Sequence, residues 1–116
     1  MTNTSIKAIG VLQLHELRER QPVELIDVRT PEEFHGIRAR NARNLPLATL
    51  DPPTLLNSRA IGENEPIYFI CEVGVRSEYA CARMIAAGFP NAINVEGGTA
   101  AWIEAGLPIE RGTIPA

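Results

Sequence analysis

An apolar run, Pro66-Ile67-Tyr68-Phe69-Ile70, leads directly into Cys71-Glu72-Val73-Gly74-Val75-Arg76, and a segment with helical spacing of its apolar residues follows. This pattern predicts a buried strand that ends at Cys71, a tight loop, and then a helix. The N–H groups of such a loop point inward, and the helix N-terminus adds partial positive charge, so together they lower a cysteine pKa and bind an anion. Cys71 is therefore predicted to be a nucleophile in a preformed anion-binding loop.

Around this central strand, the chain alternates between apolar strands and amphipathic helices. Further strands are predicted at 23–28 and 92–95, with a brief extended segment at 44–47, and helices at 11–19, 50–57, 77–87 and 99–105. The alternation predicts an α/β domain with a parallel sheet flanked by helices on both faces. In such sheets, ligand sites gather at the carboxyl ends of the strands, where the Cys71 loop must lie.

One more helix start is marked by its capping residues. Thr30 is in position to be the N-cap, Pro31 follows as the first helical residue, and Glu33 completes a capping box. Phe34 is expected to anchor this helix on the core. Core contacts are also predicted for Trp102 and Ile103, and for the shared helix face of Ala80, Cys81, Met84 and Ile85.

Length and charge limit the possible classes of protein. We expect the 116 residues to form a single domain, structured from about residue 8 to residue 111 and frayed at both ends. The net charge of −3 and the scattered basic residues predict no nucleic-acid partner. The absence of an apolar leader or of a run long enough to span a bilayer predicts a cytoplasmic protein with no membrane association.

The two cysteines, Cys71 and Cys81, favour thiol chemistry over a structural disulfide, because disulfides are rare in the cytosol. His15 and His35 lie far in sequence from both cysteines and from each other, without the short paired spacings of zinc ligands. We therefore expect no bound metal, and we expect both histidines to be surface residues of helices.

Four motifs follow one another along the chain: Asp27-Val28-Arg29-Thr30-Pro31-Glu32-Glu33-Phe34, then Asn44-Leu45-Pro46, then Cys71 to Ser77, and finally Val95-Glu96-Gly97-Gly98 with Trp102 and Gly106-Leu107-Pro108. In this order they resemble the rhodanese-like (sulfurtransferase) domain, and the resemblance runs from about Ala8 to Arg111. Each motif alone is weak evidence, but their combination is specific.

The resemblance implies a persulfide reaction that needs no metal or organic cofactor. The Cys71 thiolate attacks the outer sulfur of a small anionic donor such as thiosulfate, sulfite leaves, and a thiol or cyanide then removes the sulfur in a second step. A protein that accepts sulfur is a further candidate acceptor. Substrate binding falls to Glu72, Val73, Gly74, Val75 and Arg76, the residues that form the anion-binding loop. In this loop Gly74 permits an unusual backbone conformation, and Arg76 adds its fixed charge.

Several of these side chains have a structural alternative. Arg76 could pair with Glu72 or Glu78 instead of an anionic donor. The Glu72 side chain is expected to point toward solvent, because a carboxylate near the thiolate would raise its pKa. Cys81 is expected to pack as a small apolar residue, with a resolving thiol as the alternative.

Charged residues of the first motif and of the segment after it are also expected to be structural. Asp27, Arg29 and Glu33 occupy positions that, in the family pattern, fix strand-to-helix geometry by pairing. The segment 36–42, Gly-Ile-Arg-Ala-Arg-Asn-Ala, departs from the Gly-His-Ile-Pro-Gly-Ala common in the family, and Asn41 replaces its second glycine. Asparagine tolerates a left-handed backbone, so the turn can persist. For the basic residues of this region, Arg38, Arg40 and Arg43, a solvated loop is favoured over a basic rim that attracts the donor.

Two other function classes fit the same residues less well. A non-catalytic sulfur-carrier or binding module is one, since a fold alone does not establish chemistry. A cysteine-dependent phosphatase is the other, but phosphatase loops place five residues between cysteine and arginine, whereas four residues separate Cys71 from Arg76. This smaller ring suits a sulfur atom better than a phosphoryl group.

Overall fold

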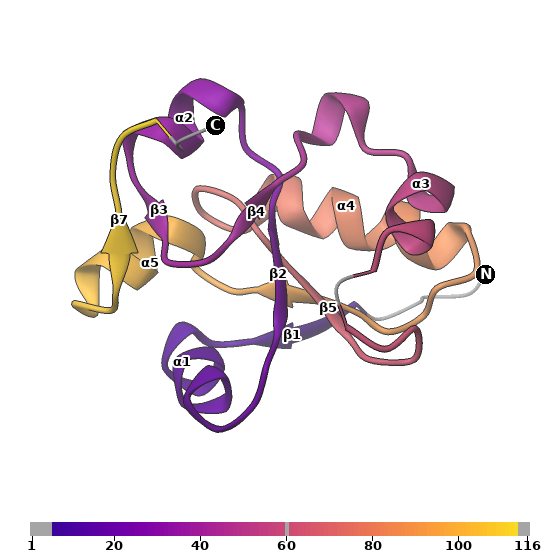
Figure 1. The fold of residues 1–116 in the computed structure, drawn as a ribbon, viewed down its shortest axis with the longest axis horizontal. Coiled ribbons are helices and arrows are strands. Elements are labelled where there is room, and N and C mark those ends of the chain that lie inside the picture. The colour runs from indigo at the N-terminus through magenta and orange to yellow at the C-terminus, as the bar shows by residue number, and fades with distance from the viewer. Residues whose placement is uncertain (1–5, 60, 114–116) are drawn as a thin grey trace.

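Five short strands form a parallel sheet at the centre of the fold, in the order β1-β6-β5-β2-β4 (Figure 1). They are β1 (Lys7–Ile9), β2 (Glu24–Asp27), β4 (Arg43–Asn44), β5 (Ile67–Ile70) and β6 (Ala92–Val95). The structure, a computed structural model, describes residues 6–59 and 61–113. The predicted α/β class and parallel sheet are confirmed.

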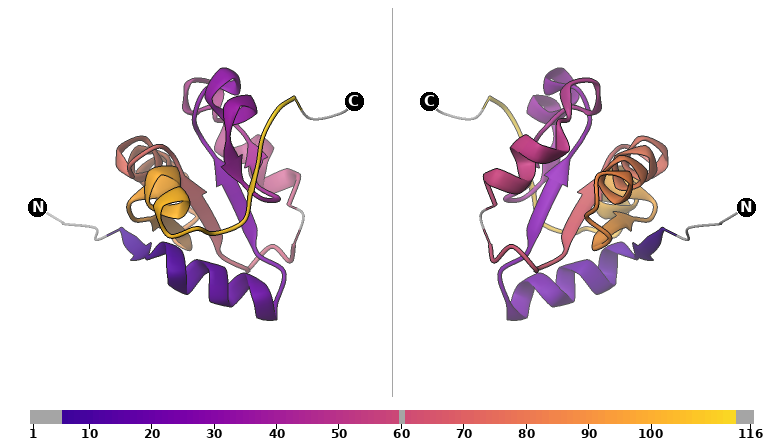
Figure 2. Two further views of the ribbon diagram at one scale, coloured as in Figure 1. Left: turned by 90° about the vertical axis from the view of Figure 1, so that its left-hand side faces the viewer. Right: turned by 90° about the vertical axis from the view of Figure 1, so that its right-hand side faces the viewer.

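Helices cover both faces of this sheet. They are α1 (Val11–Arg20), α2 (Pro31–Gly36), α3 (Pro52–Asn57), α4 (Val75–Ala86) and α5 (Gly98–Glu104), with a 3-10 turn at Leu47–Thr49. One buried cluster unites Leu14 of α1 and Trp102 of α5 with one side of the strands, and a second unites Leu55 of α3 and Met84 of α4 with the other side. The side views of Figure 2 show α1 beneath the strands.

The central strand β5 is buried on both sides. Ile67 and Phe69 belong to the cluster under α3 and α4, whereas Tyr68 and Ile70 belong to the cluster under α1 and α5. Successive side chains of a strand point to opposite faces, so a strand covered on both sides is apolar throughout. This burial fixes the end of β5, and with it the position of Cys71.

Most predicted elements are confirmed, and β5 and β6 have the predicted bounds. The α2 capping box is formed: the Glu33 N–H donates to Thr30 Oγ1 at 3.2 Å, and the Thr30 N–H donates to Glu33 Oε1 at 3.0 Å. Helix α4 begins at Val75, two residues before the predicted start. Strand β1 and a small antiparallel sheet of β3 (Arg38–Ala39) and β7 (Ile109–Glu110) were not predicted.

The predicted core is largely confirmed, but Ile85 is only partly buried and lies outside both clusters, and Ile103 needs a correction. Trp102 is 1% exposed, but Ile103 is 40% exposed, so its prediction as a core residue is wrong. Helix α5 is only seven residues long, and the residue after Trp102 points away from the sheet side. Asn41 has φ 64°, so the predicted left-handed turn is confirmed.

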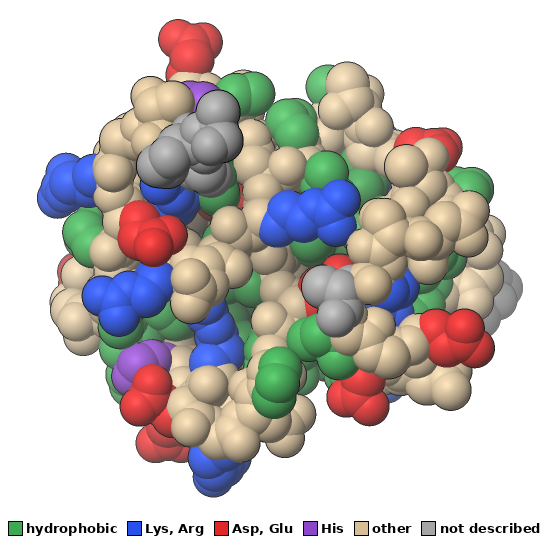
Figure 3. Space-filling view, viewed as in Figure 1, with side chains coloured by type: hydrophobic (Ala, Val, Ile, Leu, Met, Phe, Trp, Pro, Cys, Tyr) green, Lys and Arg blue, Asp and Glu red, His purple; other side chains and the backbone are tan. Residues whose placement is uncertain are grey.

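The predicted fraying at the two ends concerns mainly residues 1–5 and 114–116, which lie outside the described ranges. Within those ranges, Gly112 is tied to α2, because its N–H donates to the His35 carbonyl at 2.7 Å. On the face seen in Figure 3, acidic and basic side chains are interspersed. None of the helices in residues 6–59 and 61–113 combines the length and apolar character needed to span a bilayer. The cytoplasmic location stays a prediction.

Candidate active site

The Cys71 thiol lies at the bottom of the loop that joins β5 to α4, and the residue is 1% exposed. The Gly74 N–H donates to Cys71 Sγ at 3.1 Å, and Ser77 Oγ lies 3.3 Å from the same sulfur. Gly74 has φ 108°, in the region that glycine adopts without a steric penalty. The left-handed glycine lets the chain turn its N–H groups toward the sulfur and enter α4 at the next residue.

Burial and hydrogen bonding oppose each other at this sulfur. Burial raises the pKa of Cys71, but its contact with the Ser77 hydroxyl and hydrogen bonds from the N–H groups of Ser77, Gly74 and Val73 lower it, and the net pKa lies below the ordinary value of 9.0. Hydrogen bonds to a charged group stabilise that group. The loop therefore favours the thiolate, the form of cysteine that acts as a nucleophile.

A polar pair that the sequence analysis missed holds this arrangement. Ser77 Oγ donates to Asn94 Oδ1 at 2.5 Å, and Asn94 Nδ2 donates to the Gly74 carbonyl at 3.2 Å. Ser77 and Asn94 are both buried. One asparagine on β6 thus fixes both the loop glycine and the serine that contacts the sulfur. The available signal was a single polar residue inside the apolar strand 92–95.

Helix α5 supports the loop from below. The N–H groups of Thr99 and Ala100 donate to the carbonyls of Cys71 and Glu72, at 2.8 and 3.0 Å respectively. A Cβ atom on Gly98 would overlap the Cys71 carbonyl oxygen and would lie 2.6 Å from that of Glu72. The approach of the two backbones therefore requires glycine at position 98.

Arg76 does not pair with Glu72 or Glu78, the two structural partners considered from the sequence. Its Nη1 and Nη2 atoms donate to the two carboxylate oxygens of Glu33, at 2.8 and 2.9 Å. The hydrogen bond from Arg76, together with smaller contributions from Thr30, lowers the pKa of Glu33 to about 2. Glu33 therefore connects the first turn of α2 to the end of the Cys71 loop.

Arg29 is buried and pairs with Asp27; pairing was predicted for both residues, but no partner was assigned to either. Its Nη2 lies 2.9 Å from Asp27 Oδ2 and also donates to the Ile37 carbonyl at 2.7 Å. Glu72 is half exposed, and its Oε1 lies 3.5 Å from Arg29 Nη1. The expectation that Glu72 points to solvent therefore holds only in part, because its carboxylate also meets a buried guanidinium.

The loop residues Val73 and Val75 present their side chains to solvent and are 59% and 58% exposed. Tyr79, one helical turn after Val75, is 65% exposed. Three exposed apolar side chains therefore lie in the loop and the first turns of α4, among exposed carboxylates such as Glu72 and Glu78. Cys81 lies inside the core, and burial raises its pKa to about 12, as expected for a cysteine that packs as a small apolar residue.

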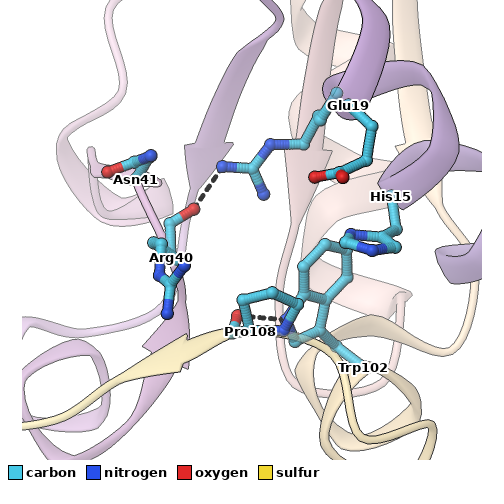
Figure 4. A pocket seen from close by; sticks show the side chains of 7 residues that line it. His15, Glu19, Arg40, Asn41, Trp102 and Pro108 are labelled. Carbon is cyan, nitrogen blue, oxygen red and sulfur yellow. Dashed lines mark hydrogen bonds between the residues drawn. The ribbon is translucent and has the colours of Figure 1, made fainter.

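The basic residues of the segment after α2 do not gather around Cys71. Arg38 is buried, and its Nη1 donates to the carbonyls of Phe34 and Gly112, so the expectation of a solvated side chain is wrong for this residue. Arg40 is exposed and lines a different pocket, of about 170 Å³, with His15, Arg18 and Trp102 (Figure 4). The Arg18 guanidinium donates to the Arg40 carbonyl there and lies over the Trp102 ring. No loop residue lines this pocket.

Comparisons with known proteins show the family of this chain. The family model of the rhodanese-like domain matches residues 11–105. An uncharacterized protein of Synechocystis is 38% identical over 107 residues, and the match covers 92% of this chain but only 57% of that protein. A sulfurtransferase of Allochromatium vinosum is 31% identical, with 80% of this chain and 83% of the relative covered. The thiosulfate sulfurtransferase GlpE of Vibrio cholerae is 29% identical, with 88% and 92% covered.

Solved structures show the same fold. A rhodanese-like domain protein from Staphylococcus aureus superposes with a TM-score of 0.69 at 39% identity, over 84% of this chain and 91% of that chain. The rhodanese-like domain of an Anabaena protein superposes with a TM-score of 0.78 at 22% identity, over 97% and 86% of the two chains.

Proposed function

Because the chain belongs to the rhodanese-like domain family, we propose that it is a sulfurtransferase with Cys71 as its nucleophile. The observation that carries this proposal is the surroundings of Cys71 Sγ. Three backbone N–H groups and the Ser77 hydroxyl meet at the sulfur and lower the pKa of the thiol. Relatives named sulfurtransferase, including one named for thiosulfate, support the reaction class.

In the first half-reaction, the Cys71 thiolate attacks the outer sulfur of a donor such as thiosulfate. The new S–S bond forms on Cys71, the S–S bond of the donor breaks, and sulfite leaves with the electron pair. The persulfide on Cys71 is an anion, and N–H groups that favour a thiolate also favour this product. Glu72 to Arg76 act as the donor-binding loop, largely through their backbone.

In the second half-reaction, a thiolate or cyanide attacks the outer sulfur of the persulfide. The acceptor takes this sulfur, and the Cys71 thiolate is restored as the leaving group. The enzyme thus alternates between a free and a sulfur-loaded form, which is ping-pong covalent catalysis. Small thiols, cyanide and protein thiols all meet the chemical requirement for an acceptor.

The direct test of this function is persulfide formation followed by turnover. Wild-type protein treated with thiosulfate should gain the mass of one sulfur atom, lose it on addition of cyanide, and release thiocyanate. Cys71→Ser should keep its far-UV circular dichroism and lose both the mass gain and the turnover. Cys81→Ser, the matched control, should retain both.

Three results would contradict the proposal. Thiocyanate production by Cys71→Ser at the wild-type rate would exclude Cys71 as the nucleophile. A stable mass gain without turnover would indicate a sulfur carrier instead of an enzyme. Hydrolysis of an aryl phosphate in place of sulfur transfer would indicate a phosphatase.

A further inference from the structure

The side chains around the Cys71 loop carry more carboxyl groups than guanidinium groups. Arg29 and Arg76 face Asp27, Glu72 and Glu33. Both guanidinium groups are already engaged, since Arg29 pairs with buried Asp27 and Arg76 makes two hydrogen bonds to Glu33. An incoming anion therefore meets the positive character of the loop N–H groups, but little uncompensated side-chain charge.

The carboxylate of Glu33 is held in place from the opposite side. Its Oε1 accepts hydrogen bonds from the N–H and the hydroxyl of Thr30, at 3.0 and 3.1 Å, while both oxygens accept from Arg76. The low pKa of Glu33, about 2, keeps it ionised wherever a thiolate exists. A doubly charged donor that approaches Arg76 is therefore repelled by the ionised Glu33 carboxylate, which already accepts hydrogen bonds from this guanidinium.

An apolar cavity adjoins Arg76. It measures about 360 Å³, and its walls include Val28, Pro46, Leu47 and Ala48. The Val28 N–H donates to the carbonyl of Ile70, the residue before Cys71, at 3.0 Å. Thr30 and Arg83 also line it, and Arg83 lies about 10 Å along α4 from Arg76. This cavity offers room and apolar contact to an organic group. Both arginines that line it already engage protein oxygens, Arg76 the Glu33 carboxylate and Arg83 the carbonyls of Leu47 and Leu50.

Building on the function proposed above, we infer that the preferred donor is an organic sulfane-sulfur compound with one negative charge, and that Glu33 sets this preference against doubly charged thiosulfate. An organic thiosulfonate is such a donor. The Cys71 thiolate attacks its terminal sulfur, the S–S bond of the donor breaks, and a sulfinate leaves with the electron pair. The Cys71 persulfide anion is the other product, so charge and atoms balance.

The test compares thiosulfate with methanethiosulfonate, in which a methyl group replaces one charged oxygen. Glu33→Gln removes the charge, while its amide oxygen can still accept the hydrogen bond from the Thr30 N–H. Since Coulomb energy scales with the charge of the donor, kcat/KM should rise about tenfold for thiosulfate and only about threefold for methanethiosulfonate. For each donor, the kcat/KM of the variant is divided by that of the wild type. This ratio cancels the difference in rate that arises because the two donors have different leaving groups. Both increases should shrink with added salt.

Glu32→Gln is the matched control. Glu32 is the exposed neighbour of Glu33, and within the described ranges it has no ion-pair partner, so the same change of charge should leave the preference between donors unaltered. In the wild-type protein, benzenethiosulfonate should have a lower KM than methanethiosulfonate, because its ring can enter the apolar cavity. This second measurement does not depend on any variant being folded.

The inference is overturned if Glu33→Gln changes kcat/KM equally for both donors or not at all, or if Glu32→Gln has the same effect as Glu33→Gln. A benzenethiosulfonate KM at or above that of methanethiosulfonate would remove the role of the cavity. In each of these cases Cys71 still forms a persulfide. Failure of every donor to load Cys71 would instead contradict the proposed function itself.

Discussion

The pKa of the buried Cys71 thiol is lowered by three backbone N–H groups and by the Ser77 hydroxyl, and the hydroxyl has the largest pKa-lowering effect. This hydroxyl has a single hydrogen atom, which it donates to Asn94 in the structure. When Cys71 is a thiolate, the same hydrogen is the one available to the sulfur. Asn94 therefore orients the Ser77 oxygen and also competes for its hydrogen.

We predict that Ser77→Ala raises the pKa of Cys71. Burial is unchanged, so its pKa-raising effect is no longer balanced to the same extent. In a Cys81→Ser background, the midpoint of the pH dependence of iodoacetamide alkylation should move to higher pH. A midpoint that lies about one pH unit higher should slow alkylation about tenfold at any pH well below it.

Ser58→Ala, on an exposed residue, is the control and should leave the alkylation midpoint in place. An unchanged midpoint in Ser77→Ala would show that the backbone N–H groups alone set the pKa of Cys71.

Sequence reasoning predicted the roles of single residues better than their partners. The spacing of Cys71 and Gly74 follows from the local requirements of a tight loop, and the left-handed φ of Gly74 confirms that reasoning. The Arg76 partner, Glu33, and the Ser77 partner, Asn94, lie 43 and 17 positions away in the sequence. Such pairings depend on how strands are ordered in the sheet, and one sequence does not specify that order.

At the scale of elements, the loop after β5 rests on the first turn of α5. The two backbone hydrogen bonds from Thr99 and Ala100 require close contact at Gly98, whose φ is 61°. The loop can therefore keep its shape without a ligand. The pair of glycines at 97 and 98 indicated a helix start in the sequence, but not its contact with the Cys71 loop.

We predict that Gly98→Ala destabilises the protein and disturbs the thiol. The left-handed backbone costs an alanine about 1–2 kcal/mol, and overlap with the carbonyls of Cys71 and Glu72 adds about 1–3 kcal/mol. Urea unfolding should report this loss of free energy, and alkylation should show a raised pKa of Cys71.

Gly106→Ala separates the two costs. Gly106 has φ 72°, but a Cβ atom there meets nothing within 4 Å. Gly106→Ala should lower the free energy of unfolding only by the cost of the left-handed backbone, and it should leave the pKa of Cys71 unchanged. Equal losses of stability in the two variants would show that the close contact at Gly98 is unimportant.

Elements with a clear period or a capping box were predictable, whereas very short ones were not. Strand β5 is apolar throughout, and α2 begins at Pro31 directly after its N-cap Thr30, so both elements were predictable. Strands β3 and β7 have two residues each and are too short for any periodicity to be recognised. Their pairing with each other also places Arg38 in a buried position that the loop interpretation did not anticipate.

At the scale of the whole molecule, the sheet separates two buried clusters that share the same strands. Leu14 of α1 and Met84 of α4 lie on opposite faces, and both are fully buried. Because the three central strands, β2, β5 and β6, each contribute to both clusters, neither cluster can come apart without exposing the other side of the sheet. The domain should therefore unfold in one cooperative transition.

We predict that Leu14→Ala and Met84→Ala each lower the free energy of unfolding by about 2–5 kcal/mol. Trp102, the only tryptophan, lies in the cluster with Leu14 and reports on that face by fluorescence. If the sheet couples the two clusters, Met84→Ala on the opposite face should shift the Trp102 fluorescence midpoint and the circular dichroism midpoint together. A fluorescence midpoint that stays at the wild-type value while the circular dichroism midpoint falls would show that the two faces unfold separately.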